Sequence, residues 1–190
     1  DIASWYDEEE DITYLLVGCE NGTALFRMLP GARPIFMGKL PTQSVTSLWR
    51  DIKVVHGHAY IVSEAPAHGM QVMDLEALRA WSPLEGPVTW APDTVVSTPS
   101  TAHNVVAFEE ASKIIQVGTS TMGGGAVIFD LSDPSAPSLI GGLSEWGSLH
   151  DAQALIYNGP DAAHVGKEIL FAAGGESLWI LDITDASDVQ

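Results

Sequence analysis

The chain has 190 residues, of which 46% are hydrophobic and 17% are charged, and its formal net charge is −17. Eight basic residues against 25 acidic ones argue against a nucleic-acid partner, because a phosphate backbone is bound by clustered cations. No run of roughly 18 or more apolar residues occurs, so the sequence predicts no transmembrane segment in this chain.

The chain begins at Asp1 without an apolar leader, and we interpret it as a mature form or an internal piece of a longer protein. Cys19 is the only cysteine, which rules out an internal disulfide. This says little about the compartment, because larger secreted β proteins also do without disulfides.

Short runs rich in β-branched and aromatic residues, bounded by Gly, Pro, Asn or Asp, predict strands along most of the chain. In chain order the clearest are Ile12 to Val17, Ala59 to Ser63, Met70 to Leu75, Ile114 to Gly118, Ala126 to Leu131 and Ser177 to Ile183. The one helical pattern, Leu75 to Trp81, predicts one or two turns before Pro83. The sequence therefore predicts an all-β fold.

Three short markers recur in the same order about every 50 residues. The first strand marker centres on Val17, Val62, Val117 and Ala172. The strand after it centres on Arg27, Asp74, Asp130 and Asp182. The third marker precedes both and reads Arg50-Asp51, His103-Asn104 and His150-Asp151. A repeat of this length with three or four strands is typical of a β-propeller blade.

We therefore expect a single β-propeller segment with repeats at about 1–47, 48–101, 102–148 and 149–190. The first repeat lacks the third marker and is expected to be partial, and the last ends in mid-repeat. This gives about three complete blades plus a partial one, as in a fragment of a longer ring. Residues 48–186 are expected to form four-stranded antiparallel sheets, with 158–167 as a loop between the first two strands of the last repeat.

Several segments resemble LVIVD repeats and, together, the choice-of-anchor B family over about residues 45–186. They are Arg50 to Val54, Ala59 to Glu64, Gly69 to Leu75, His103 to Val106, Phe129 to Pro134, His150 to Gln153 and Tyr157 to Asp161. The resemblance implies a secreted or cell-surface protein held by varied C-terminal anchors, with no established biochemical activity. Where family members often carry cysteine, this chain has Met122, Ala154 and Leu170, so the resemblance implies no disulfide here.

The third marker supplies the candidate site residues, which are Asp51, His103, Asn104, His150 and Asp151. In a propeller the first strand of each blade lines the central channel, so equivalent residues are expected to meet at one mouth. Carboxylate, amide and imidazole groups together are suited to Ca²⁺ or another divalent cation. The alternative is structural: these side chains cap strand starts and bond to loops, with Arg50 neutralising the carboxylates.

Other features favour structural interpretations. The Gly123 to Gly125 triplet precedes a strand rather than a helix, which favours a hairpin over a phosphate-binding loop. His56, His58, His68 and His164 lie in loop-like segments and are expected at the surface. The hydroxyl and imidazole residues match no nucleophile or metalloprotease motif.

The leading functional hypothesis is a non-enzymatic, secreted or cell-surface propeller that serves as a binding or scaffold module. Its expected partner is a protein or glycan ligand, or the remaining part of its own propeller. The alternative hypothesis is a metal-dependent hydrolase or lyase with its site at the channel mouth, and it rests on the His, Asp and Asn marker alone.

Overall fold

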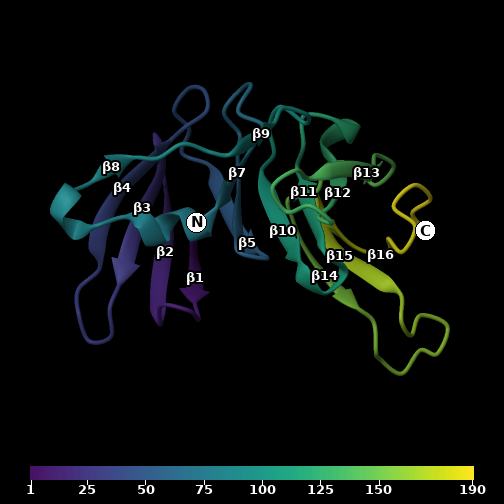
Figure 1. The fold of residues 1–190 in the computed structure, drawn as a ribbon. Helices are drawn as coiled ribbons and strands as arrows, with labels where there is room; N and C mark the ends of the chain where they lie inside the picture. The colour runs from purple at the N-terminus through teal and green to yellow at the C-terminus, as the bar shows by residue number, and fades with distance from the viewer.

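The computed structural model describes residues 1–190 and contains four sheets that follow one another along the chain (Figure 1). The first sheet holds β1 (Ile2–Asp7), β2 (Ile12–Cys19), β3 (Gly22–Met28), β4 (Ile35–Pro41) and β8 (Val88–Thr89). The second holds β5 (Arg50–Val55), β6 (His58–Ser63), β7 (Met70–Asp74) and β9 (Thr94–Val96). The third holds β10 (Asn104–Phe108), β11 (Lys113–Val117), β12 (Ala126–Asp130) and β13 (Ser138–Leu143). The fourth holds β14 (Asp151–Ile156), β15 (Glu168–Gly174) and β16 (Ser177–Asp182).

Helical structure is confined to four short 3-10 segments, η1 (Leu75–Ala80), η2 (Pro83–Glu85), η3 (Glu109–Ala111) and η4 (Met122–Gly124). The η1 segment confirms the helical pattern expected after β7. Its N-terminus is capped by Asp74, whose side chain accepts the N–H of Glu76. The η4 segment is the turn of the β11–β12 hairpin, so the glycine triplet does serve a hairpin.

The all-β prediction is confirmed, and each of the six expected strands differs by at most two residues at either end from the strand that forms. Residues 157–167 connect β14 to β15 without regular structure, which confirms the expected loop. Residues 1–47, expected to be a partial repeat, hold the four strands β1–β4. The prediction of a four-stranded sheet is wrong for the last repeat, because β14, β15 and β16 are its only strands within the chain.

The four sheets stack in the order of the chain, with their first strands side by side. β1 contacts β5, β5 contacts β10, and β10 contacts β14 (Figure 1). The second and third sheets therefore have a neighbour on each face, which explains why their strands are apolar on both faces rather than alternating. In β11, Ile114 packs with the second sheet, and the next residue, Ile115, packs with the fourth.

Three apolar cores fill the spaces between the sheets. Leu16 and Leu25 of the first sheet pack with Ile52 and Ile61 of the second. The other two cores follow the same plan between the second and third sheets and between the third and fourth. Each fully buried Ile or Leu contributes about 1.5–3 kcal/mol relative to an exposed position, so these cores hold the row of sheets together.

An ion pair between a buried carboxylate and a partly exposed guanidinium adds a polar link between the first two sheets. Asp7, at the end of β1, accepts hydrogen bonds from Nε (2.6 Å) and Nη2 (2.9 Å) of Arg79 in η1. The Arg79 guanidinium holds the pKa of the Asp7 carboxyl below its ordinary value. The pair thus fixes η1 of the second repeat against the far end of β1.

Candidate polar binding pocket

The polar residues of the third sequence marker occupy equivalent positions in successive sheets. The Asp or Asn of each marker is the first or second residue of the first strand of its sheet. Each pairs with a residue near the end of the second strand. The pairs are Asp51 opposite Val62, Asn104 opposite Val117 and Asp151 opposite Ala173. The sequence repeat therefore corresponds to a structural one.

Asp1 holds the same position in the first sheet, which corrects the expectation that the first repeat has no such marker. Its carbonyl accepts the N–H of Gly18, one step beyond the Ile2–Val17 pair. Asp1 lies 50 residues before Asp51, which agrees with the repeat length, but it is not part of an Arg or His pair of the kind that marks the other three repeats. A polar residue directly before an apolar strand, as in Asp1-Ile2 and Asp51-Ile52, was the available signal.

All five predicted site residues line one pocket of about 410 Å³ where the first strands meet. Its lining consists of Asp1, Trp49, Arg50, Asp51, Lys53, His103, Asn104, His150 and Asp151. Sequence reasoning therefore found the cluster, and it missed Asp1, Trp49 and Lys53 as members. Lys53 lies two residues after Asp51 in β5, so strand alternation places both side chains on one face of the sheet.

Asp51 is buried and uses both carboxylate oxygens. Oδ2 accepts the N–H of Val105 in the third sheet at 2.8 Å. Oδ1 accepts the N–H of Ile52 at 3.0 Å and the Nζ of Lys53 at 2.7 Å. Lys53, and not Arg50, therefore neutralises this carboxylate, and Asp51 joins the second sheet to the third.

The same kind of link recurs on either side of Asp51. Asp1 Oδ2 accepts the N–H of Ile52 at 3.3 Å and Lys53 Nζ at 3.2 Å, which joins the first sheet to the second. Asn104 Nδ2 donates to the carbonyl of His150 at 3.2 Å, which joins the third sheet to the fourth. Three successive sheet junctions are thus bridged by the side chain at one repeated position.

Asp151 is the member of this series without such a partner. Its side chain is exposed, and Oδ1 accepts the N–H of Ala152 at 2.8 Å. Asp51 makes the equivalent bond to its own following residue, Ile52, and in addition reaches the next sheet. Within residues 1–190 no further sheet packs on this face to offer Asp151 a donor.

Arg50 points away from the neighbouring carboxylates. Its guanidinium donates to the carbonyl of Cys19 (3.2 Å) and to Thr42 Oγ1 (2.8 Å), and Nη1 lies 2.8 Å from Nε2 of His68. A guanidinium can only donate, so Nε2 of His68 must be the acceptor in this contact. The ring proton of His68 is therefore on Nδ1, which donates to the carbonyl of Gly69. Arg50 is thus held by neutral groups.

His68 is fully buried, so its predicted surface location is wrong. Desolvation lowers the pKa of its imidazole, and the charge of Arg50 lowers it further. Both causes favour the neutral ring that the hydrogen bond from Arg50 requires. Sequence context gave no signal of this role, because Arg50 and His68 are brought together only by the β5–β6–β7 sheet.

The exposed part of the pocket carries aromatic and imidazole groups. The rings of His103 and His150 lie 4.2 Å apart at an interplanar angle of 52°. His103 Nδ1 lies 2.5 Å from Oε1 of Glu64, a residue that the sequence had not indicated. Trp49 is 58% exposed, with its ring 6.2 Å from that of His103. An open indole thus borders a row of hydrogen-bonding side chains.

No group of three or more His, Cys, Asp or Glu side chains in the chain is arranged to hold a metal ion. Divalent-cation binding by Asp51, His103, Asn104, His150 and Asp151 remains a prediction. Comparison with protein-family models, curated proteins and solved structures found no match to this chain. None of its helical segments is long and apolar enough to cross a membrane.

Proposed function

We propose that the chain is a β-propeller segment of the LVIVD-repeat, choice-of-anchor B type, which serves outside the cell or at its surface as a binding module. The stacked sheets, the adjacent first strands and the repeated polar position support a propeller arrangement. The LVIVD-like segments support the extracellular setting through the family they resemble.

The proposed ligand site is the polar pocket, and the proposed ligand is a glycan. The observation that carries this proposal is the exposed indole of Trp49 beside His103, Asn104 and His150. A sugar presents hydroxyls that need several hydrogen-bonding partners, and its apolar ring face packs on an aromatic side chain. Trp49 is the one hydrophobic residue of the lining, so it would orient the ring while the polar residues select its hydroxyls.

The alternative, a metal-dependent hydrolase or lyase, has weaker support. Both oxygens of Asp51 are engaged by backbone N–H groups and by Lys53. A metal ion at Asp51 would have to displace Lys53 or break the link to the third sheet. The mixed charge of the pocket is better suited to a neutral polyol than to a compact cation.

Titration with neutral mono- and oligosaccharides, followed by tryptophan fluorescence and calorimetry, tests the glycan proposal. We expect saturable binding that Trp49→Ala abolishes and Trp49→Phe partly retains. Leu48→Ala is the matched control, because Leu48 is 79% exposed, adjoins Trp49 and does not line the pocket. Absence of binding across the panel, or binding that Trp49→Ala leaves intact, would rule the proposal out.

A further inference from the structure

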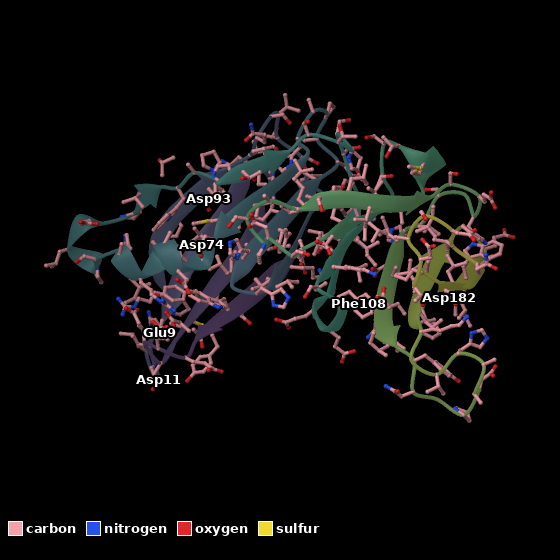
Figure 2. All side chains as sticks on the ribbon, turned by 45° about the vertical axis from the view of Figure 1, so that its right-hand side comes forward. Glu9, Asp11, Asp74, Asp93, Phe108 and Asp182 are labelled. Atoms are coloured by element: carbon pink, nitrogen blue, oxygen red, sulfur yellow. The ribbon has the colours of Figure 1, made fainter.

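Two turns from the second and third sheets meet at the end of the strands opposite the polar pocket. The pocket lies where β5 and β10 begin, and the turns lie where these strands end. His56 and Gly57 form the turn between β5 and β6, with φ values of +48° and +72°. Ser112 follows η3 in the turn between β10 and β11. Figure 2 shows Phe108, the residue directly before η3, at the lower end of its sheet.

Three side chains of these turns form a row of contacts. Nε2 of His56 lies 3.1 Å from Oγ of Ser112. On the other side of the ring, Nδ1 of His56 lies 3.6 Å from Oε1 of Glu109. That is an ion-pair distance rather than a hydrogen bond, and such contacts are often long before a substrate binds. The order of carboxylate, imidazole and hydroxyl is the one that activates a serine for nucleophilic catalysis.

The carboxylate determines which nitrogen of the His56 ring carries the proton. An ionised carboxylate can only accept, so Nδ1, which faces Glu109, carries the proton and Nε2 keeps its lone pair. Nε2 is then the acceptor for the hydroxyl proton of Ser112. When this proton is transferred, the nearby carboxylate stabilises the imidazolium that forms. His56 is therefore placed to act as a base toward Ser112.

The backbone of Ser112 has a conformation that residues other than glycine rarely adopt, with φ of 49° and ψ of 53°. Backbone positions of this kind are found preferentially at functional sites. Hydrogen bonds hold the turn on both sides of the serine. Its N–H donates to the carbonyl of Glu109 at 2.9 Å, and its carbonyl accepts the N–H of Leu131 at 2.8 Å. The hydroxyl is thus carried by a fixed turn.

A second contact between a histidine and a serine offers a comparison within the chain. Nε2 of His58 lies 2.8 Å from Oγ of Ser135. Nδ1 of His58 faces the carbonyl of His56 at 2.9 Å, where His56 itself has a carboxylate. A carbonyl orients the ring but has no full negative charge to stabilise an imidazolium. Of the two serines, Ser112 therefore has the more complete arrangement.

From this geometry we infer that Ser112 is a nucleophile, activated by His56 and Glu109, that hydrolyses small carboxylic esters. Ser112 Oγ bonds to the acyl carbon while its proton passes to Nε2 of His56. The bond from the acyl carbon to the alcohol oxygen breaks, and the alcohol leaves with that proton. Water then attacks the acyl carbon and gives a proton to Nε2. The carboxylic acid is released as Ser112 Oγ regains the proton.

The net charge of −17 favours uncharged or cationic esters over anionic ones. The reaction needs no metal ion and does not involve the polar pocket, so it is independent of the proposed glycan binding. Labelling with a fluorophosphonate, followed by peptide mass spectrometry, tests it directly. We expect modification at Ser112 and slow hydrolysis of 4-nitrophenyl acetate. Modification of Ser135 to the same or a greater extent, or of neither serine, would overturn the inference.

Two variants remove the reacting groups and keep the turns. Ser112→Gly removes the hydroxyl, and glycine is suited to the left-handed backbone at this position. His56→Asn removes the base, and asparagine before Gly57 is suited to this turn. Ser112→Gly should abolish labelling at this site, and His56→Asn should slow it about a hundredfold. A labelling rate that His56→Asn leaves unchanged would contradict activation by histidine.

Two further variants test the carboxylate and the comparison pair. The Glu109 side chain is 65% exposed, so water weakens its effect, and Glu109→Gln should slow labelling of Ser112 only about tenfold. Ser135→Ala is the matched control, because it removes the hydroxyl beside His58, and it should label at the rate of the unaltered chain. Loss of Ser112 labelling in Ser135→Ala would overturn the assignment. Urea unfolding of every variant confirms that each is folded under the labelling conditions.

Discussion

Asp51 and Asp151 occupy one position of the repeat and yet have different surroundings. Asp51 is 6% exposed and bonds two backbone N–H groups and a lysine, whereas Asp151 is exposed and bonds one. The residue type is the same, so the difference comes from the third sheet, which packs beside Asp51 and has no counterpart beside Asp151 within residues 1–190. The pair therefore offers an internally controlled measurement of what this side chain contributes to stability.

We expect Asp51→Ala to lower the free energy of unfolding by about 2 kcal/mol, because the buried N–H of Val105 loses its acceptor and Lys53 loses its closest anion. Asp151→Ala should change it by less than about 0.5 kcal/mol, as is usual for exposed sites. Urea unfolding at low protein concentration measures both. Equal effects of the two substitutions would show that the link between sheets does not contribute.

The Arg50–His68 contact predicts a pH dependence. Burial lowers the folded-state pKa of His68 below its ordinary value of 6.5, so the unfolded chain takes up the proton first as pH falls. The stability that this contact contributes is therefore complete above the ordinary pKa of 6.5 and is lost as the pH falls from there through the folded-state pKa. The urea midpoint of unfolding should be lower at about pH 5 than at about pH 7.5, and this difference should be smaller in His68→Gln. Glutamine keeps an acceptor for Arg50 but does not titrate, so identical pH profiles would contradict the assignment.

At the scale of the elements, the fourth strands of the first and third sheets, β4 and β13, each contain a glycine where the backbone of the following repeat approaches closely. Gly141 lies opposite Ile128 at a bulge between β12 and β13. A Cβ there would lie 1.8 Å from the carbonyl oxygen of Ala186, in the segment after β16. Gly38 in β4 has the same relation to the backbone of Val88. Glycine at these two bulges therefore lets the backbone of the following repeat pack directly against the fourth strand.

Gly141→Ala should destabilise the chain by about 3 kcal/mol, because neither backbone can move without breaking the bulge or the turn after β16. Gly147→Ala is the control. Gly147 has a φ of +74° in open space, so alanine there carries only a backbone cost of about 1 kcal/mol. Thermal and urea unfolding should rank the two variants in this order. If Gly141→Ala destabilised the chain less than Gly147→Ala, the backbone of Ala186 could not lie as close to Gly141 as described.

For the whole molecule, the repeat markers were sufficient to predict an all-β chain of successive sheets. They succeeded because strands apolar on both faces leave a dense pattern of Val, Ile and Leu between turn residues, as at Ile114 and Ile115. They also brought together Asp51, Asn104 and Asp151, since equivalent positions in stacked sheets become neighbours in space.

The remaining parts of the site were not identified from the sequence, each for a specific reason. Asp1 was missed because it lacks the Arg or His that precedes the polar residue in the other markers, although its distance from Asp51 fits the repeat. His68 was missed because its partner Arg50 lies 18 residues earlier in the chain, in β5. The choice of Lys53 over Arg50 as the partner of Asp51 depends on which face each side chain takes. Strand alternation gives that information once the bounds of β5 are known, because Lys53 is two residues from Asp51 and Arg50 is only one, but the repeat markers alone do not.

The net charge of −17 gives the last prediction, which concerns salt. Self-repulsion among 25 acidic residues destabilises the folded chain, and salt at about 0.15 M shortens its range to about 8 Å. We expect the thermal midpoint to rise with NaCl, and CaCl₂ at matched ionic strength to have a similar effect, because Lys53 and backbone N–H groups already occupy Asp51. An additional, saturable rise with CaCl₂ that Asp51→Asn removes would contradict this and support the divalent-cation site predicted from the sequence. Differential scanning fluorimetry with NaCl, MgCl₂ and CaCl₂ series, on the unaltered chain and on Asp51→Asn, decides between the two.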